Sequence, residues 1–170
     1  NHCRQAIKGS PDSPEAHLNL GRILLETGQF EQCVEPIAQA LRLRPTDPTA
    51  NYYWGHVLHR RGKPKEAADY YRRAIELDAQ FIPPMLGLAT LCIADARASV
   101  AELKEALKLA KRACDLTGRK DLQALRILAG MYAVAGRLDD AVNTARDAIQ
   151  AARAAGNEEA AQQIQEMLKL

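Results

Sequence analysis

The sequence repeats itself at an interval of 34 residues, and this periodicity constrains the fold more than any other feature. When the chain is shifted by this interval, small residues fall on small ones and large apolar residues on large ones. The aligned sets are Leu20-Gly21, Trp54-Gly55 and Leu88-Ala89; Gly28 and Gly62; Cys33 and Ala67; Ala40 and Ala74; Leu43 and Leu77. After a short insertion the pattern returns between Leu128 and Ala148. A repeat of this length is one supersecondary unit that must stack on its neighbours to bury its apolar face.

The composition favours an all-α fold and excludes several functions. Good helix formers dominate, and aromatic residues make up only 5% of the 170 residues. A formal net charge of +2 is too small to indicate a nucleic-acid-binding surface. No apolar run approaches the roughly 20 residues that span a bilayer. We therefore expect no membrane insertion by this segment.

The repeat resembles the tetratricopeptide repeat (TPR), whose pattern is W-x₂-L-G-x₂-Y, then A-x₃-F, then P. Four copies match this pattern, with departures in single slots. Their key residues are Leu20-Gly21, Leu24, Cys33, Ile37 and Pro45; Trp54-Gly55, Leu58, Ala67 and Tyr71; Leu88-Ala89, Cys92 and Ala106; and Leu128-Ala129, Tyr132 and Ala141. The resemblance covers nearly the whole chain. It implies an all-α fold, a right-handed α-solenoid of TPR helix-turn-helix hairpins with a C-terminal capping helix.

The resemblance also predicts the domain boundaries. They are the tail of a truncated preceding repeat at 1–13, TPR 1 at 14–47, TPR 2 at 48–81, TPR 3 at 82–120, TPR 4 at 122–155 and the capping helix at 157–170. TPR 3 carries five extra residues around 95–101, and we expect it to have a long first helix, a wide turn and a capping box at Ser99 and Glu102. In the capping helix, one packed face is expected. It consists of Ala160, Ala161, Ile164 and Leu168.

Glycines and alanines at fixed places explain how each hairpin is built. Gly28, Gly62 and Gly136 are expected to end the first helix of their hairpins, because glycine tolerates the left-handed conformation. Gly21 and Gly55 lack bulk in the middle of a helix, which lets two helix axes approach closely.

In the TPR family the first helices line a concave groove that binds peptides, and the matching positions predict a site here. The predicted residues are Leu18, Asn19, Arg22, Tyr52, Tyr53, His56, His59, Arg60, Thr90 and Arg126. Tyrosine and arginine are frequent binding anchors. The arginines favour a partner with acidic groups. The alternative is a solvated face whose tyrosines only cover neighbouring helices.

Two specialised mechanisms of the family are not supported. The carboxylate clamp for chaperone C-termini needs lysine, asparagine and arginine in slots that hold Leu18, Arg22, Tyr53, Pro83 and Gly87. The asparagine ladder of the O-linked sugar transferase repeats needs one asparagine per repeat. Only Asn19 meets that need, since Tyr53, Gly87 and Ile127 occupy the other slots.

Catalytic, metal and RNA functions are also disfavoured. No nucleophile-base pair or phosphate-binding loop is recognisable, so the sequence predicts no enzyme and no cofactor. His56 and His59 lie one helical turn apart, but two ligands do not make a metal site. The basic stretch 60–73 could contact phosphates, yet Glu66 and Asp69 interrupt it.

The sequence thus predicts a non-enzymatic protein–protein interaction scaffold that binds a peptide or protein segment in its concave groove. Because the chain begins inside a hairpin and ends with a cap, the alternative is a C-terminal TPR recognition or assembly arm of a larger enzyme or membrane protein, such as a glycosyltransferase. Self-association through the N-terminal end, where Ala6 and Ile7 are poorly covered, is a further expectation.

Four cysteines are predicted to act as small buried apolar residues rather than as disulfides. They are Cys3, Cys33, Cys92 and Cys114, and none belongs to a CxxC pair. Unpaired thiols favour a reducing, cytoplasmic compartment.

Overall fold

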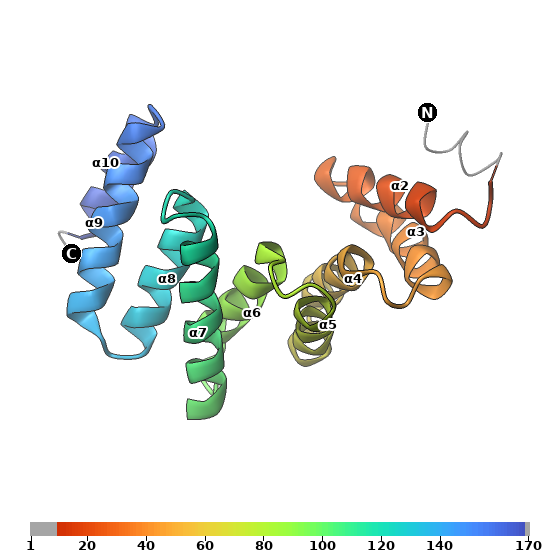
Figure 1. Cartoon of the computed structure of the whole chain (residues 1–170), viewed down its shortest axis with the longest axis horizontal. Coiled ribbons are helices and arrows are strands. Elements are labelled where there is room, and N and C mark those ends of the chain that lie inside the picture. The colour runs from red at the N-terminus through yellow and green to blue at the C-terminus, as the bar shows by residue number, and fades with distance from the viewer. Residues whose placement is uncertain (1–9, 169–170) are drawn as a thin grey trace. The chain divides into compact units, whose positions relative to one another are not determined.

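The computed structural model describes residues 10–168, and every regular element in this range is an α-helix (Figure 1). The helices are α2 (Pro14–Glu26), α3 (Phe30–Leu43), α4 (Pro48–Arg60), α5 (Pro64–Leu77), α6 (Ile82–Ala94), α7 (Val100–Leu116), α8 (Leu122–Val134), α9 (Leu138–Ala154) and α10 (Glu158–Met167). The predicted fold class, an all-α fold built from solenoid-type helical hairpins, is confirmed. The predicted tail at 1–13, apart from residues 10–13, lies outside the described residues, as do Cys3, Ala6 and Ile7.

The chain divides into two compact units, Asn1–Pro84 and Met85–Leu170. In the first unit α2 packs against α3, α3 against α4, and α4 against α5. In the second unit α8 packs against α7 and α9, and α10 covers α9. Each of these contacts joins two helices that are consecutive in the sequence. The observed hairpins fall within the predicted repeat ranges, although the boundaries of the repeats stay predictions.

The glycine turns form as the sequence predicts. Gly28 has a φ of +75°, and the next residue, Gln29, donates its N–H to the carbonyl of Leu24 at 2.8 Å. The same arrangement follows α8, where Gly136 has a φ of 71° and Arg137 donates to Tyr132 at 2.9 Å. These bonds satisfy helix-end carbonyls that would otherwise lack a partner, so the chain reverses direction within three residues.

Side-chain caps begin the first helices of the hairpins. Ser13 accepts the N–H of Ala16 at 3.2 Å, and Asp47 accepts the N–H of Ala50 at 2.9 Å. A proline follows each of these caps, where its missing N–H leaves no helical hydrogen bond unmade. The start of α2 and α4 is therefore fixed to a single residue.

The prediction of a long first helix in the third repeat is wrong. The helix α6 has 13 residues, as do α2, α4 and α8. Asp95 ends it, because its carboxylate accepts the N–H of Arg97 at 2.8 Å and competes with helical hydrogen bonding. The extra residues lie instead in the wider turn 95–99 and in α7, which has 17 residues against 14 in α3 and α5. The predicted capping box of Ser99 and Glu102 is present.

The last helix, α10, ends earlier than the sequence predicts, and one residue of its expected packed face is exposed. Asn157 caps α10 by accepting the N–H of Ala160 at 3.0 Å, and Ala161 and Ile164 are buried. Leu168, which the sequence placed on the same face, is 37% exposed. It is the C-cap residue just beyond Met167, and its N–H still donates to the carbonyl of Ile164 at 3.2 Å, but its side chain stays exposed.

Close approach of the paired helices occurs at the two predicted glycines. A Cβ atom on Gly21 would lie 2.4 Å from Cγ1 of Ile37, and one on Gly55 would lie 2.7 Å from Cε1 of Tyr71. Ile37 and Tyr71 are buried in the second helix of the same hairpin. A large side chain of α3 or α5 thus fills the space that each glycine leaves.

The three cysteines in the described range are free and buried, as predicted. Burial raises the pKa of each thiol, that of Cys114 to about 11. Cys33 donates to the carbonyl of Phe30 at 3.0 Å. These side chains act as core residues and are held as thiols at neutral pH. Within residues 10–168 no helix is long and apolar enough to cross a bilayer.

The glycine contact leads to a stability prediction. We expect Gly55→Ala to lower the free energy of unfolding of the first unit by about 1 kcal/mol. Overpacking costs about 1–3 kcal/mol and the better helix propensity of alanine returns about 1 kcal/mol. The ring of Tyr71 is 1% exposed, and the carbonyl oxygen of Ala67 would lie 3.2 Å from the new methyl group, so little room remains.

Urea unfolding followed by the fluorescence of Trp54, the only tryptophan, measures this change. Gly130→Ala, in the second unit, is the control, and its unfolding is followed by far-ultraviolet circular dichroism because Trp54 lies in the first unit. Its methyl group would meet only the flexible side chain of Ile93, at 3.1 Å from Cδ1. A midpoint for Gly55→Ala equal to or above that of the parent would contradict the packing argument.

Candidate peptide-binding face

Eight of the ten predicted site residues lie on the first helices of the first unit. We call this surface the α2–α4 face. It consists of Leu18, Asn19 and Arg22 on α2 and Tyr52, Tyr53, His56, His59 and Arg60 on α4. Asn19 and Arg60 are exposed, and the other six residues are half-buried. The face is therefore partly open to solvent and partly built into the packing beneath it.

Tyr52 is the centre of an aromatic cluster. Its ring centroid lies 5.1 Å from that of Tyr53 and 6.5 Å from that of His56. On its inner side it lies 5.8 Å from Tyr71 and 5.6 Å from Phe81. Rings at these distances attract one another, and the buried Tyr71 fixes the position of the others. The exposed parts of the cluster are thus held rigidly.

Tyr53 connects α4 to the preceding hairpin. It packs against a buried cluster that contains Leu24 of α2 and Ile37 of α3. Burial raises the pKa of Tyr53, and the neighbouring Tyr52 raises it further. Burial also raises the pKa of Tyr52. Both hydroxyls stay protonated at neutral pH and can donate a hydrogen bond.

The charged groups of the face have partners within the protein. Arg22 donates through Nη1 to both carboxylate oxygens of Glu26, at 2.8 and 3.0 Å. The guanidinium of Arg60 lies 5.4 Å above the ring of Phe30, which is a cation–π arrangement. The prediction that arginines at this site favour an acidic partner is untested. Because Arg22 and Arg60 already have contacts within the protein, the case for an acidic partner is weaker.

His56 is uncharged in the folded protein at neutral pH. Burial lowers the pKa of its imidazole, and the neighbouring His59 and Arg60 lower it further. Its Nδ1 atom is buried and has no hydrogen-bond partner. Protonation would add a second N–H with no acceptor, which is consistent with the low pKa.

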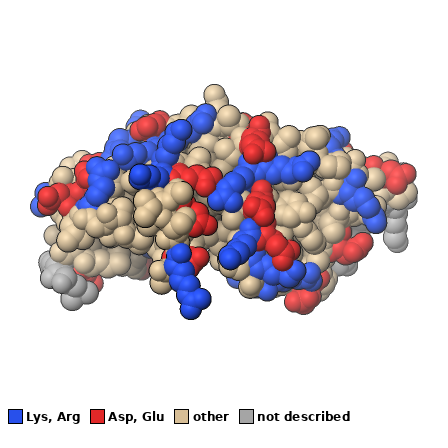
Figure 2. Space-filling view, turned by 90° about the horizontal axis from the view of Figure 1, so that it is seen from below, with Lys and Arg blue, Asp and Glu red and all other residues tan. Residues whose placement is uncertain are grey.

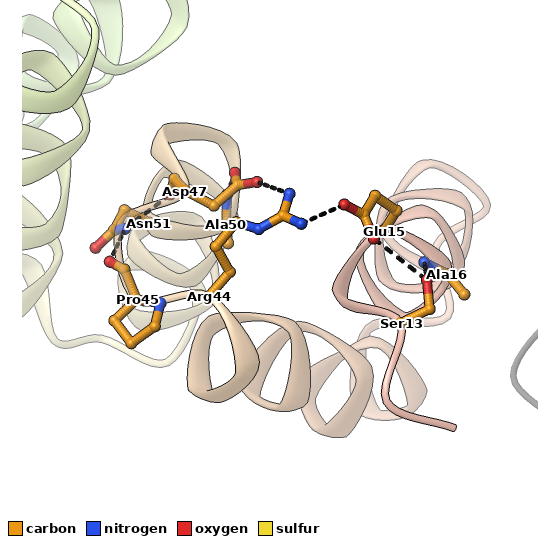
Figure 3. Close-up of polar contacts among 8 residues, drawn as sticks. All are labelled: Ser13, Glu15, Ala16, Arg44, Pro45, Asp47, Ala50 and Asn51. Carbon is orange, nitrogen blue, oxygen red and sulfur yellow. Dashed lines mark hydrogen bonds and ion pairs between the residues drawn. The ribbon is translucent and has the colours of Figure 1, made fainter. Parts of the chain in front are cut away.

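A polar network at the hairpin junction helps to position α4 relative to α2. Figure 3 shows Arg44, from the turn after α3, between two carboxylates. Its Nη2 lies 2.5 Å from Oε1 of Glu15, and its Nη1 lies 3.8 Å from Oδ2 of Asp47. The buried Asn51 donates through Nδ2 to the carbonyls of Pro45 and Asp47, at 2.9 and 2.8 Å. Asn51 stands at the repeat position where the family pattern has tryptophan. Its side chain instead hydrogen-bonds the turn that precedes α4.

Thr90 and Arg126 belong to the second unit and are exposed. Thr90 lies on α6 and donates its hydroxyl to the carbonyl of Leu86 at 2.8 Å, so its own helix already uses that donor. Arg126 lies on α8, four residues before Gly130 and on the same side of the helix. As site residues, Thr90 and Arg126 stay predictions. They concern the second unit alone.

Sequence reasoning missed the residues that support the face from below. Phe30 lies under Arg60, and Phe81 and Tyr71 lie against Tyr52. Phe30 and Phe81 stand at or near turns, where the repeat pattern requires no aromatic residue. Glu26, by contrast, was detectable, because it follows Arg22 by four residues on a helix.

Other candidate chemistry finds no support in the described range. Residues 10–168 contain no cluster of three or more His, Cys, Asp or Glu side chains that could hold a metal ion. Figure 2 shows Lys and Arg side chains interleaved with Asp and Glu on the surface in view. A shallow depression exists on α5, and its lining also mixes both signs: Asp69, Tyr70, Arg72, Arg73, Glu76 and Leu77.

Repeated helical hairpins with glycine turns and small residues at the helix crossings define a helical-repeat protein. Two family profiles, both described as tetratricopeptide repeat, match residues 1–52 and 48–81. Residues 1–81 therefore contain tetratricopeptide repeats.

Solved structures of similar fold agree with this assignment. The protein MamA has a TM-score of 0.73 and 19% sequence identity over 91% of this chain and 86% of its own. YrrB, a TPR protein with an unusual peptide-binding site, has a TM-score of 0.71 and 21% identity over 96% of this chain and 89% of its own. Yeast Tom70 has a TM-score of 0.72 and 22% identity over 98% of this chain and 36% of its own. At such identities the likeness establishes the fold alone. No curated protein sequence matches the chain.

The low pKa of His56 leads to a prediction about pH. In the unfolded chain the imidazole takes up its proton near pH 6.5, as roughly expected for histidine. The folded protein resists protonation until a lower pH. The free energy of unfolding is therefore fully retained above about pH 6.5 and falls as the pH drops through the folded pKa.

Urea midpoints measured from about pH 7.5 to about pH 5 test this dependence. We expect His56→Gln, which cannot titrate, to lose less stability over this interval than the parent. Equal losses in the two proteins would show that His56 does not contribute.

Proposed function

We propose that this chain is a non-enzymatic scaffold that binds an extended segment of another polypeptide on the α2–α4 face. The observation that carries the proposal is the aromatic cluster around Tyr52. The rings of Tyr52, Tyr53 and His56 are half-buried, and Tyr52, which neighbours both of the others, also lies against Tyr71 and Phe81. Rigid aromatic side chains with polar tips give a large contact area at little entropic cost.

Two further features support binding rather than simple coverage of neighbouring helices. The polar tips point to a role beyond packing, because a tyrosine that only fills a core could be a phenylalanine. The face also combines two adjacent first helices, α2 and α4, because Tyr53 packs against a buried cluster that includes Leu24 of α2. An extended segment crossing both helices would contact side chains from each.

The alternative, a recognition or assembly arm of a larger enzyme or membrane protein such as a glycosyltransferase, would use the same face. It differs only in what the rest of such a protein does. Binding by the second unit, through Thr90 and Arg126, is a separate proposal that depends on residues of that unit alone.

Peptide selection from a random library tests the proposed function. We expect selected peptides to bind the parent and to lose about 2 kcal/mol of binding free energy for each change in the variant Tyr53→Ala with His56→Ala. Isothermal titration calorimetry measures the loss. Tyr70→Ala is the matched control, because Tyr70 lies on α5 outside the α2–α4 face, and it should bind as the parent does.

Tyr53 also contacts the core, so folding is checked by circular dichroism and by the urea midpoint. A second variant, Tyr53→Phe with His56→Gln, keeps most of the volume of both side chains and removes or changes only their polar tips. Selected peptides that bind both variants as tightly as the parent would rule out this face.

A further inference from the structure

The helix α7, in the second unit, carries a stripe of lysines. Lys104, Lys108 and Lys111 follow one another at intervals of four and three residues, so they project from the same side of the helix. Lys104 and Lys108 are exposed, and Lys111 is half-buried. Asp115 is the next residue on this side and ends the stripe. Within residues 10–168 none of the three lysines forms an ion pair, so their positive charges are not neutralised by the protein itself.

A fourth positive charge lies beside Lys111, at the turn between α8 and α9. The Nζ atom of Lys111 lies 5.4 Å from the ring centroid of Tyr132, and Cζ of Arg137 lies 4.7 Å from it. Tyr132 is buried, and its ring attracts both cations and keeps them close together. Arg137 also pairs with Asp140 at 2.5 Å, in an exposed contact that water screens. An anionic group bound beside the two cations relieves their mutual repulsion.

Two large aliphatic side chains are exposed at the same turn. Val134 ends α8 and is 45% exposed, and Leu138 begins α9 and is 67% exposed. Arg137 lies between them in the sequence, and its N–H donates to the carbonyl of Tyr132 at 2.9 Å. Apolar side chains therefore flank the positive charge of Arg137 on a turn that hydrogen bonding fixes.

Figure 1 shows that α7 and α8 run in opposite directions within the second unit. The first half of α7 and the turn between α8 and α9 therefore lie at the same end of this unit. We call this surface the α7–α9 patch. It consists of Lys104, Lys108, Lys111, Val134, Arg137 and Leu138. The patch thus combines a row of cations with exposed aliphatic side chains.

Two carboxylates beside the patch restrict the kind of anion that fits it. Asp139 and Asp140 follow Leu138 directly in the first turn of α9. A nucleic acid has closely spaced phosphates, which these carboxylates repel, and its backbone offers nothing apolar to Leu138. An anionic membrane that took up Leu138 would meet the same two carboxylates at its surface. A polypeptide, by contrast, can place single carboxylates at the lysines and aliphatic side chains at Val134 and Leu138.

We propose that the α7–α9 patch binds an acidic segment of another polypeptide, in which aliphatic side chains stand next to the carboxylates. Carboxylates about 5–6 Å apart match the lysines, because residues three or four apart on a helix have this separation. Charge complementarity positions the segment, and the contacts with Val134 and Leu138 add to its affinity. This site is separate from the α2–α4 face and does not depend on the function proposed for that face.

The test uses the full chain and a labelled peptide made of glutamate and leucine. A second peptide of equal length has glutamine in place of glutamate. Fluorescence anisotropy should show that the acidic peptide binds at low salt and the glutamine peptide does not. Raising the salt should weaken the binding at least about fivefold, because exposed charges are screened.

Charge reversal locates the binding site. Lys104→Glu with Lys108→Glu should weaken the binding of the acidic peptide at least about tenfold. Lys65→Glu with Arg73→Glu is the matched control, because it reverses two exposed cations of α5 in the first unit and changes the net charge equally. It should bind as the parent does. Absent binding of the acidic peptide, or an equal loss in the two variants, overturns the proposal.

Leu138→Ser separates the aliphatic contact from charge. Because Leu138 is exposed, this variant should fold as the parent does, weaken the binding about threefold and keep the same salt dependence. An unchanged affinity would overturn the aliphatic part of the proposal. Tyr53→Ala with His56→Ala should bind the acidic peptide as the parent does, so failure of the proposed function and failure of this site are distinguishable.

Two other probes test the class of partner. They are a labelled oligothymidine and vesicles of phosphatidylserine and phosphatidylcholine, and we expect both to bind more weakly than the acidic peptide. Tighter binding of either probe that Lys104→Glu with Lys108→Glu abolishes would overturn the proposal, because the partner would then be a nucleic acid or a membrane.

Discussion

The close contact between a glycine of one helix and a large side chain of the next is the constraint on which the first unit depends. Gly21 faces Ile37, and Gly55 faces Tyr71, at distances that leave no room for a methyl group. Dispersion forces fall steeply with separation, so helices that approach this closely gain more contact than helices held apart by side chains. The glycines destabilise an isolated helix, and the packing they permit more than offsets that cost.

The same contact determines which side chains remain at the surface. Once Gly55 faces α5, the neighbouring positions of α4 carry Tyr52, His56 and His59, which are half-buried. Tyr71 serves both purposes, because it fills the space beside Gly55 and also lies under Tyr52. The candidate site is thus attached directly to the best-packed point of the hairpin. Such support is what keeps a binding surface in one conformation before its partner arrives.

The 34-residue periodicity predicted the helices and turns well. It did not predict where a local side-chain hydrogen bond ends a helix. The glycine turns and the capping box at Ser99 are short-range signals, and the structure follows them. The length of α6 could not be read from helix propensity, because one hydrogen bond from Arg97 to Asp95 ends it. The supporting rings of Phe30 and Phe81 were also out of reach. Their contacts join residues that the repeat does not relate, and only the folded chain brings them together.

Helical spacing weakens the case for an acidic partner at the α2–α4 face, which stays an untested prediction. Residues four apart on a helix lie on one side of it, which is how Arg22 enters the face. The same spacing places Glu26 directly beside Arg22 and neutralises it. The rings of Tyr52, Tyr53 and His56 are uncharged at neutral pH. If a polypeptide segment binds this face, as we propose, ring contacts contribute more to its recognition than charge does.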